Sequence, residues 1–158
     1  GYTAKVAGTE RGITEPTATF SPCFGGPFLT LHPLRYAELL KDKMEKFDVD
    51  VYLVNTGWVG ASAKSGAKRF NLPKTREIIN SILGGEIEKS EFETDPYFGF
   101  QIPISLGEID SNLLNPIRAW DNLDEYHTTA KELVQKFQAN YKQYDLGDTA
   151  VLNAGPSL

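Results

Sequence analysis

The fold is decided by the sequence VYLVNTGWVGASAKSGAKRFNLPKTR, which occupies residues 51–76. It opens with an apolar run, residues 51–54, which predicts a strand over residues 51–55, and residues 73–83 show the apolar spacing of a helix. A further helical pattern, residues 33–47, precedes the strand. This order predicts an α/β fold, a mixed sheet flanked by helices. Ligands bind such sheets at the carboxyl ends of strands, so we expect a binding loop over residues 57–76.

Positive charge is concentrated in this loop. No acidic residue occurs between Asp50 and Glu77. Because the chain has 21 Asp and Glu residues and a net charge of −5, this gap in the acidic residues is notable. A cationic loop beside a strand-to-helix turn favours an anionic ligand. Five of the 16 Lys and Arg residues lie in it: Lys64, Lys68, Arg69, Lys74 and Arg76.

Helix polarity supports an anionic ligand but leaves an alternative open. Pro73 suits the first helical position, which places Lys74 and Arg76 in the first turn. The helix dipole disfavours each cation there by roughly 0.3–1 kcal/mol, and a bound phosphate would offset this. The alternative is a solvated basic loop that only raises solubility. The phosphate-loop pattern G-x-x-x-x-G-K-[ST] is absent, since one residue too many separates Gly60 from Gly66 and no Lys follows.

Size and composition are those of an ordinary globular domain. The 158 residues are enough to bury a core, and 41% of them are hydrophobic. No apolar run approaches the roughly 20 residues that span a bilayer. A single cysteine fits a reducing cytoplasm, and the net charge of −5 makes duplex nucleic acid a poor partner. The chain begins at Gly1 without an initiator Met or a signal-peptide pattern, so we expect a processed or truncated product.

Two segments precede the first helix. Residues 2–19 are rich in Thr and Gly and predict an extended, mobile loop, which is either a lid over a ligand or a plain connector. Residues 20–31 are aromatic and punctuated by glycines, and we expect them to pack into the core. Cys23 lies among them and is interpreted as a small buried residue rather than a nucleophile.

Caps and periodicity define the first two helices. His32 at the cap and Pro33 at the first position predict the start of the helix over residues 33–47. Gly84 and Gly85 are expected to end the helix over residues 73–83 through a left-handed residue.

Three further segments complete the chain. Residues 86–95 read as a solvated acidic patch. Residues 98–105 alternate apolar and polar side chains and predict a strand, which Pro103 confines to an edge or a bulge. Asp121 is expected to cap a long final helix. Its apolar stripe consists of Tyr126, Ala130, Leu133, Val134, Phe137, Tyr141 and Tyr144.

Catalytic chemistry is not evident in the sequence. The two histidines, His32 and His127, are far apart and lack the spacing of metal ligands. No Ser–His–Asp constellation can be assembled. We therefore assign no catalytic residue and no metal ligand, and interpret the chain as a ligand-binding part of something larger.

Five blocks of sequence carry a family resemblance. In chain order they are residues 1–16, residues 20–25, residues 53–58, the pairs Lys68-Arg69 and Thr75-Arg76, and residues 154–156. These blocks resemble, in the same order, segments of ATP-dependent phosphoenolpyruvate carboxykinases. The resemblance runs over the whole chain. It implies that residues 1–158 are the carboxy-terminal portion of such an enzyme, within its nucleotide-binding domain.

The resemblance implies an activity and a set of site residues. The family converts oxaloacetate and ATP to phosphoenolpyruvate, CO₂ and ADP in gluconeogenesis, with Mg²⁺ on the nucleotide and Mn²⁺ in the active site. Arg69 and Phe70 match the pair that contacts the adenine and ribose, and Thr75 matches an adenine-side threonine. The loop over residues 57–76 would then hold the base and sugar of ATP or ADP, and residues 2–19 would form the lid.

The resemblance also implies what lies outside this chain. The family's phosphate-binding lysine loop, its Mn²⁺ ligands and its oxaloacetate-binding arginines lie upstream. The chain alone is therefore expected to be inactive. Its expected partner is the amino-terminal remainder of the same cytoplasmic enzyme, with no membrane or nucleic acid.

One departure and one alternative remain. Where relatives commonly have Gly before the Lys-Arg pair, this chain has Ala67, and a left-handed conformation there would cost about 1 kcal/mol. The alternative function is a non-catalytic module that binds an acidic partner or a single-stranded nucleic acid. It would use the basic loop over residues 64–76 together with Trp58 and Phe70.

Overall fold

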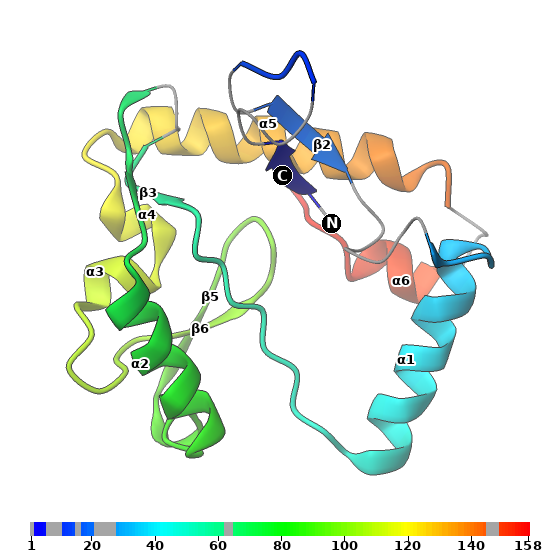
Figure 1. Cartoon of the computed structure of the whole chain (residues 1–158), viewed down its shortest axis with the longest axis horizontal. Helices are drawn as coiled ribbons and strands as arrows, with labels where there is room; N and C mark the ends of the chain where they lie inside the picture. The colour runs from blue at the N-terminus through cyan, green and yellow to red at the C-terminus, as the bar shows by residue number, and fades with distance from the viewer. Residues whose placement is uncertain (1, 6–10, 15–16, 21–27, 62–64, 145–148) are drawn as a thin grey trace. The chain divides into compact units, whose positions relative to one another are not determined.

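The computed structural model describes residues 2–5, 11–14, 17–20, 28–61, 65–144 and 149–158 (Figure 1). The chain divides into two compact units, Gly1–Val54 and Asn55–Leu158. It is built of helices and small sheets, which confirms the α/β class in its broad sense. The described strands form three two-stranded antiparallel sheets rather than the one mixed sheet expected from the sequence.

The first unit opens with a hairpin. β1 (Tyr2–Lys5) pairs antiparallel with β2 (Thr17–Phe20), from Tyr2 opposite Phe20 to Lys5 opposite Thr17. The two ends of the expected loop are thus paired strands. In the aromatic stretch over residues 20–31, Cys23 lies outside the described residues. Phe28, which we expected in the core, has 87% of its surface exposed.

The helix α1 (Pro33–Phe47) begins as the sequence predicted. His32 is its N-cap, and the His32 Nδ1 atom accepts a hydrogen bond from the Leu34 backbone N–H at 3.4 Å. Asp48 ends the helix in the left-handed conformation, with φ of 47°. None of the residues of α1 is fully buried.

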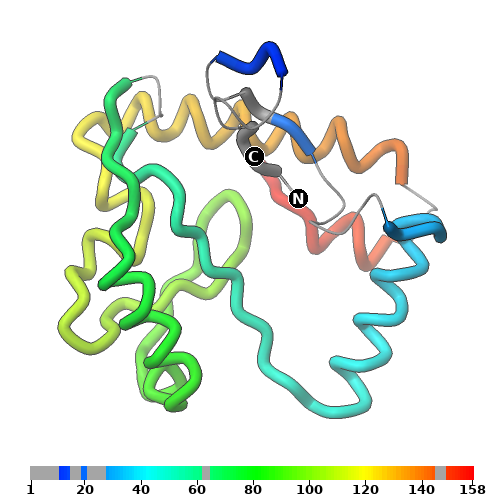
Figure 2. The backbone as a smooth tube through the Cα atoms, viewed as in Figure 1, coloured from blue at the N-terminus to red at the C-terminus, as the bar shows by residue number. Residues whose placement is uncertain are grey.

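The prediction of a strand over residues 51–55 is wrong. These residues run as an extended segment that carries no assigned strand (Figure 2). A strand is defined by hydrogen bonds to a neighbour, and no described strand pairs with this segment. The Leu53 side chain, which a buried strand would cover, is 77% exposed.

The second unit contains the remaining elements. They are β3 (Trp58–Val59), β4 (Lys68–Arg69), α2 (Leu72–Leu83), the 3₁₀ helix η3 (Ile87–Lys89), β5 (Phe92–Thr94), β6 (Gln101–Pro103), α3 (Ser111–Leu114), α4 (Pro116–Ala119), α5 (Leu123–Tyr141) and α6 (Thr149–Asn153). β3 pairs with β4, and β5 pairs with β6.

The end of α2 confirms the expected glycine stop. Gly85 has a φ of 71°, and its N–H donates to the Ile82 carbonyl at 3.1 Å. The Glu86 N–H donates to the Ser81 carbonyl at 2.9 Å. These two bonds form a Schellman motif in which Gly85, rather than Gly84, supplies the left-handed residue.

The β5–β6 hairpin corrects two expectations. The predicted strand over residues 98–105 is shorter, since only Gln101–Pro103 pair with β5. Pro103 lies at an edge, as expected, because both strands of a two-stranded sheet are edges. Asp95, which we expected to be solvated, is 6% exposed. Its carboxylate accepts bonds from the Tyr97 and Phe98 N–H groups, at 2.9 and 2.6 Å, and so holds the turn.

The core of the second unit has two parts. Ile87, Leu106 and Ile109 are buried together, and Ile78, Ile82 and Leu114 pack against them. The stripe of α5 supplies buried Tyr126, Ala130 and Val134, as predicted. The cap of α5 is Asn122 rather than Asp121, because the Asn122 side chain accepts from the Asp124 and Glu125 N–H groups at 3.1 Å.

Candidate functional site

The β3–β4 hairpin fixes the end of the basic loop. Trp58 lies opposite Arg69, and Val59 lies opposite Lys68. The Phe70 N–H donates to the Gly57 carbonyl at 2.9 Å, which extends the ladder by one position. The backbone at Arg69 and Phe70 is therefore held by hydrogen bonds rather than left as a free loop.

The start of α2 fixes the residues that follow. Asn71 is the N-cap, and its side-chain oxygen accepts from the Lys74 N–H at 3.0 Å. The helix begins at Leu72, so Lys74 lies in its first turn, and Arg76, which we expected there, lies beyond it. Asn at a cap is a strong sequence signal that we overlooked in favour of the proline.

A basic hollow of about 510 Å³ lies beside this hairpin and helix start. The described residues that line it all belong to the second unit. They are Val59, Gly60, Ala61, Ser65, Gly66, Ala67, Lys68, Arg69, Phe70, Asn71, Lys74, Leu113, Ala119 and Asp121. Pockets for small ligands in proteins typically measure about 300–1,000 Å³, so this one has the size for a nucleoside.

The lining of the basic hollow carries more positive than negative charge. Among the described lining residues, three are cationic, Lys68, Arg69 and Lys74, and one is a carboxylate, Asp121. None of these three cations forms an ion pair with a carboxylate in the described part of the chain. Unneutralised cations around a concave surface raise the local concentration of anions. The basic hollow therefore suits an anionic ligand. The sequence did not predict that Asp121 would line this site.

Two glycines shape the loop. Gly60 has a φ of 81°, and a Cβ atom built on it would lie 2.5 Å from the Ala119 carbonyl oxygen. The loop thus passes directly against the end of α4. Gly66 has a φ of 79°. Among the described residues only Asp48 combines a side chain with positive φ, so Ala67 is not strained and our concern about it was wrong. The left-handed position falls on Gly66 instead.

The predicted site residues are distributed unevenly. Arg69, which is exposed, and Phe70, which is half-buried, both line the basic hollow. Thr75 does not line it, and its hydroxyl donates to the Asn71 carbonyl at 2.9 Å. Lys64 lies outside the described residues. Arg76 lines a different hollow.

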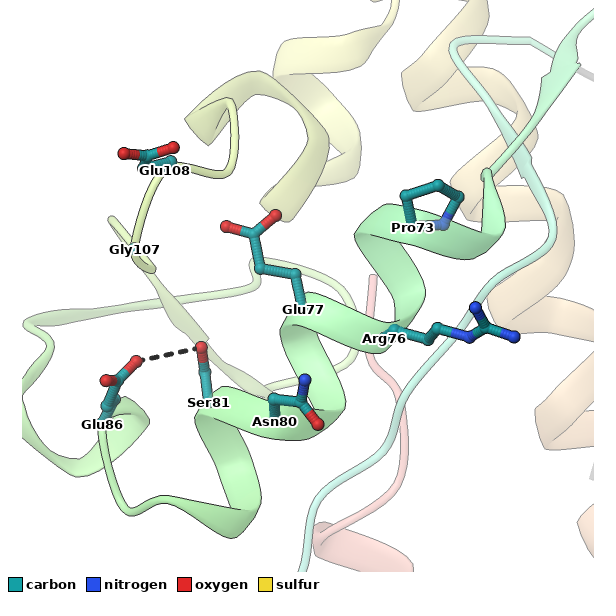
Figure 3. A pocket seen from close by; sticks show the side chains of 8 residues that line it. All are labelled: Pro73, Arg76, Glu77, Asn80, Ser81, Glu86, Gly107 and Glu108. Carbon is teal, nitrogen blue, oxygen red and sulfur yellow. Dashed lines mark hydrogen bonds between the residues drawn. The ribbon is translucent and has the colours of Figure 1, made fainter.

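That second hollow is acidic and measures about 460 Å³ (Figure 3). Glu86 accepts a hydrogen bond from the Ser81 hydroxyl at 3.3 Å, and the Arg76 side chain points away from Glu77. Its three carboxylates disfavour an anion, so it is not the candidate site. Its lining consists of Pro73, Arg76, Glu77, Asn80, Ser81, Glu86, Gly107 and Glu108.

The buried aromatic groups form a separate cluster. Burial raises the pKa of Tyr126 to about 12, and Asp95 and Tyr97 act in the same direction. The Tyr97 hydroxyl lies 2.6 Å from the His127 Nδ1 atom. Within the described ranges, no three His, Cys, Asp or Glu side chains gather as a metal site would require. No described helix combines the length and apolarity needed to cross a membrane.

Comparison with known proteins identifies relatives. The family model described as "Phosphoenolpyruvate carboxykinase" matches residues 1–112. Among proteins named "Phosphoenolpyruvate carboxykinase (ATP)", that of Leptospira biflexa is 56% identical over 147 residues, or 93% of this chain. Those of Caldanaerobacter subterraneus and Campylobacter jejuni subsp. doylei are 51% and 54% identical, over 99% and 92% of this chain. The chain spans 28% to 30% of the length of these relatives.

Proposed function

The chain belongs to the ATP-dependent phosphoenolpyruvate carboxykinase family, and we propose that it is the carboxy-terminal part of such an enzyme's nucleotide-binding domain. The whole enzyme would convert oxaloacetate and ATP to phosphoenolpyruvate, CO₂ and ADP in gluconeogenesis. Residues 57–76 would supply the adenine and ribose side of the ATP site, and residues 2–19 the lid. The observation that carries this proposal is the basic hollow, which Arg69 and Phe70 line in a chain of this family.

The lining of the basic hollow matches the chemistry of adenosine. The half-buried Phe70 ring and the Arg69 guanidinium are groups that stack on a purine face. Lys68 and Lys74 add positive charge, which favours the attached phosphates. Thr75 does not line the basic hollow, and its hydroxyl already donates to the Asn71 backbone carbonyl, so its adenine-side role is proposed on the family resemblance alone.

The described residues offer no fit for the family's metals. The described residues hold no group of carboxylates and histidines suited to a metal ion. We assign the Mg²⁺ and Mn²⁺ sites, the phosphate-binding loop and the oxaloacetate site to the amino-terminal remainder. That remainder would be the chain's main partner, with the single cysteine favouring a reducing cytoplasm as their location.

The test is a substitution in the full-length enzyme. Arg69→Ala should raise the KM for ATP by roughly 3-fold to 30-fold, as expected for loss of a stacked cation, while the KM for oxaloacetate changes less. Arg76→Ala is the matched control, because Arg76 is a nearby arginine that lines the other hollow.

Two results would contradict the proposal. One is an ATP affinity that Arg69→Ala and Arg76→Ala change equally. The other is salt-sensitive binding of single-stranded RNA with which ATP does not compete, which would favour the binding-module alternative.

A further inference from the structure

We propose that Trp58 is a positioning residue for nucleotide binding, which holds the Arg69 guanidinium in place through its indole ring. This inference rests on the proposed function, since it concerns the same site. Trp58 does not line the basic hollow, whereas Arg69 does. Trp58 would therefore act on the nucleotide only through Arg69.

Strand register brings the two side chains together. The hydrogen bond from Phe70 N–H to the Gly57 carbonyl makes Gly57 and Phe70 a hydrogen-bonded pair of the antiparallel ladder. The next pair, Trp58 and Arg69, is then a non-hydrogen-bonded pair. Side chains approach each other most closely across such pairs. The register thus places the indole beside the arginine before any ligand arrives.

The contact itself is a cation–π interaction. The Arg69 Cζ atom lies 5.9 Å from the centre of the Trp58 ring. This is within the roughly 6 Å over which a guanidinium is attracted to an aromatic face, and Trp gives the strongest attraction of the aromatic residues. No described carboxylate pairs with Arg69. The indole is therefore the group that orients this side chain.

Preorganisation explains why this contact matters for binding. A free arginine side chain samples many rotamers, and fixing it on a ligand costs conformational entropy. An arginine already held against Trp58 loses less freedom when it stacks on a purine. Trp58 is 36% exposed and is not a member of the buried cluster of Ile87, Leu106 and Ile109, so replacing it opens no cavity in that cluster.

The experiment is a double-mutant cycle in the full-length carboxykinase, measured by steady-state kinetics. The variants are Trp58→Leu, Trp58→Phe, Arg69→Ala and the double variant Trp58→Leu with Arg69→Ala. Leu keeps apolar bulk without a π face, whereas Phe keeps a π face. Trp120→Phe is the control, because Trp120 packs against Tyr126, with ring centroids 5.9 Å apart, and not against Arg69.

We expect Trp58→Leu to raise the KM for ATP about 2-fold to 5-fold, with kcat and the KM for oxaloacetate unchanged. Trp58→Phe should recover most of the loss. In the Arg69→Ala background, Trp58→Leu should add nothing, because the residue it positions is gone. Trp120→Phe should leave the KM for ATP unchanged.

Other outcomes overturn the inference. If Trp58→Leu raises the KM for ATP equally with and without Arg69, Trp58 does not act through Arg69. If Trp58→Leu has no effect while Arg69→Ala does, positioning fails and the proposed function stands. If Arg69→Ala itself leaves ATP binding unchanged, the proposed function fails first, and the inference fails with it. If Trp58→Leu raises both KM values and lowers kcat, as misfolding would, the Trp58→Phe variant decides between the two explanations. A Trp58→Phe enzyme that does not recover affinity for ATP would exclude the π contact.

Discussion

At the scale of the residue, Gly60 is the described glycine of the binding loop with the least room for a side chain. A Cβ atom there would lie 2.5 Å from the Ala119 carbonyl oxygen, and the φ of 81° is itself unfavourable for a side chain. Gly66 has a similar φ of 79° but nothing within 4 Å of its Cβ position. Substitution of Gly66 therefore measures the cost of the backbone conformation alone, and substitution of Gly60 adds the cost of a steric clash.

We predict that Gly60→Ala destabilises the chain by roughly 2–4 kcal/mol, from conformation and clash together. Gly66→Ala should cost only about 1 kcal/mol, from conformation alone. Urea unfolding followed by circular dichroism measures both values. Equal losses for the two variants would show that the loop does not press against Ala119.

Tyr126 gives a second prediction at this scale, in alkaline solution. Its pKa is raised from 10.0 to about 12, chiefly by burial. Because the folded state binds this proton more tightly than the unfolded state, the contribution to stability is complete below pH 10 and is lost as the pH rises from about 10 to about 12.

Absorbance of tyrosinate near 295 nm should therefore include a component that titrates at about pH 12, and Tyr126→Phe should remove it. Tyr126→Phe should also lose less stability than the parent chain over this pH window. A titration curve unchanged by Tyr126→Phe would place the late group elsewhere.

At the scale of the element, local signals predicted the long helices α1, α2 and α5, but they missed the short helices α3, α4 and α6 and were less successful for the strands. His32 with Pro33 gave the start of α1, and the paired glycines gave the end of α2. Helix caps and apolar periodicity depend on residues three or four positions apart, so they can be read directly from the sequence. Whether residues 51–55 become a strand depends on a partner that the sequence does not specify.

The candidate site shows the same division. Arg69 and Phe70 could be chosen from the basic loop and the resemblance, and the structure places both in the basic hollow. Asp121 could not be chosen, because it reaches the hollow from the segment between α4 and α5. That proximity is created by tertiary packing. The exposure of Asp95 was wrongly predicted for a related reason. Its acidic neighbours indicated a solvated segment, whereas its carboxylate accepts hydrogen bonds from two backbone N–H groups of a turn.

The cap of α2 gives a prediction about the element that carries Lys74 and Thr75. Asn71→Ala removes the bond to the Lys74 N–H and should cost about 0.5–2 kcal/mol of stability. Asn80→Ala is the control, because Asn80 is an exposed residue of the same helix and does not cap it. Urea unfolding compares the two variants. Equal stabilities for them would mean that Asn71 does not hold the helix start.

At the scale of the whole molecule, the described residues of the first unit include no buried apolar side chain. Every buried apolar residue in the described part of the chain belongs to the second unit. In the first unit Leu40, Phe47, Val51 and Leu53 are all more than half exposed. The chain spans 28% to 30% of its relatives' length, and we infer that the remainder of the enzyme covers these side chains.

This inference predicts that the surface around residues 51–54 joins the two parts of the enzyme. When the chain is co-expressed with the amino-terminal remainder, Leu53→Asp should reduce co-purification, because burying a leucine contributes roughly 1.5–3 kcal/mol and burying an unpaired carboxylate opposes it. Lys43→Asp, a charge change at an exposed position of α1, is the control. Unchanged co-purification of Leu53→Asp would exclude this surface.

The most direct test of the central claim, that the basic hollow takes the adenosine part of ATP, is photolabelling of the full-length enzyme with 8-azido-ATP and mapping of the labelled peptides. The reactive group sits on the purine, so it marks the residues around the base. We predict label within residues 57–76, at or beside Phe70, and its loss when unlabelled ATP is in excess. ATP-protected label found only outside residues 57–76 would contradict the account.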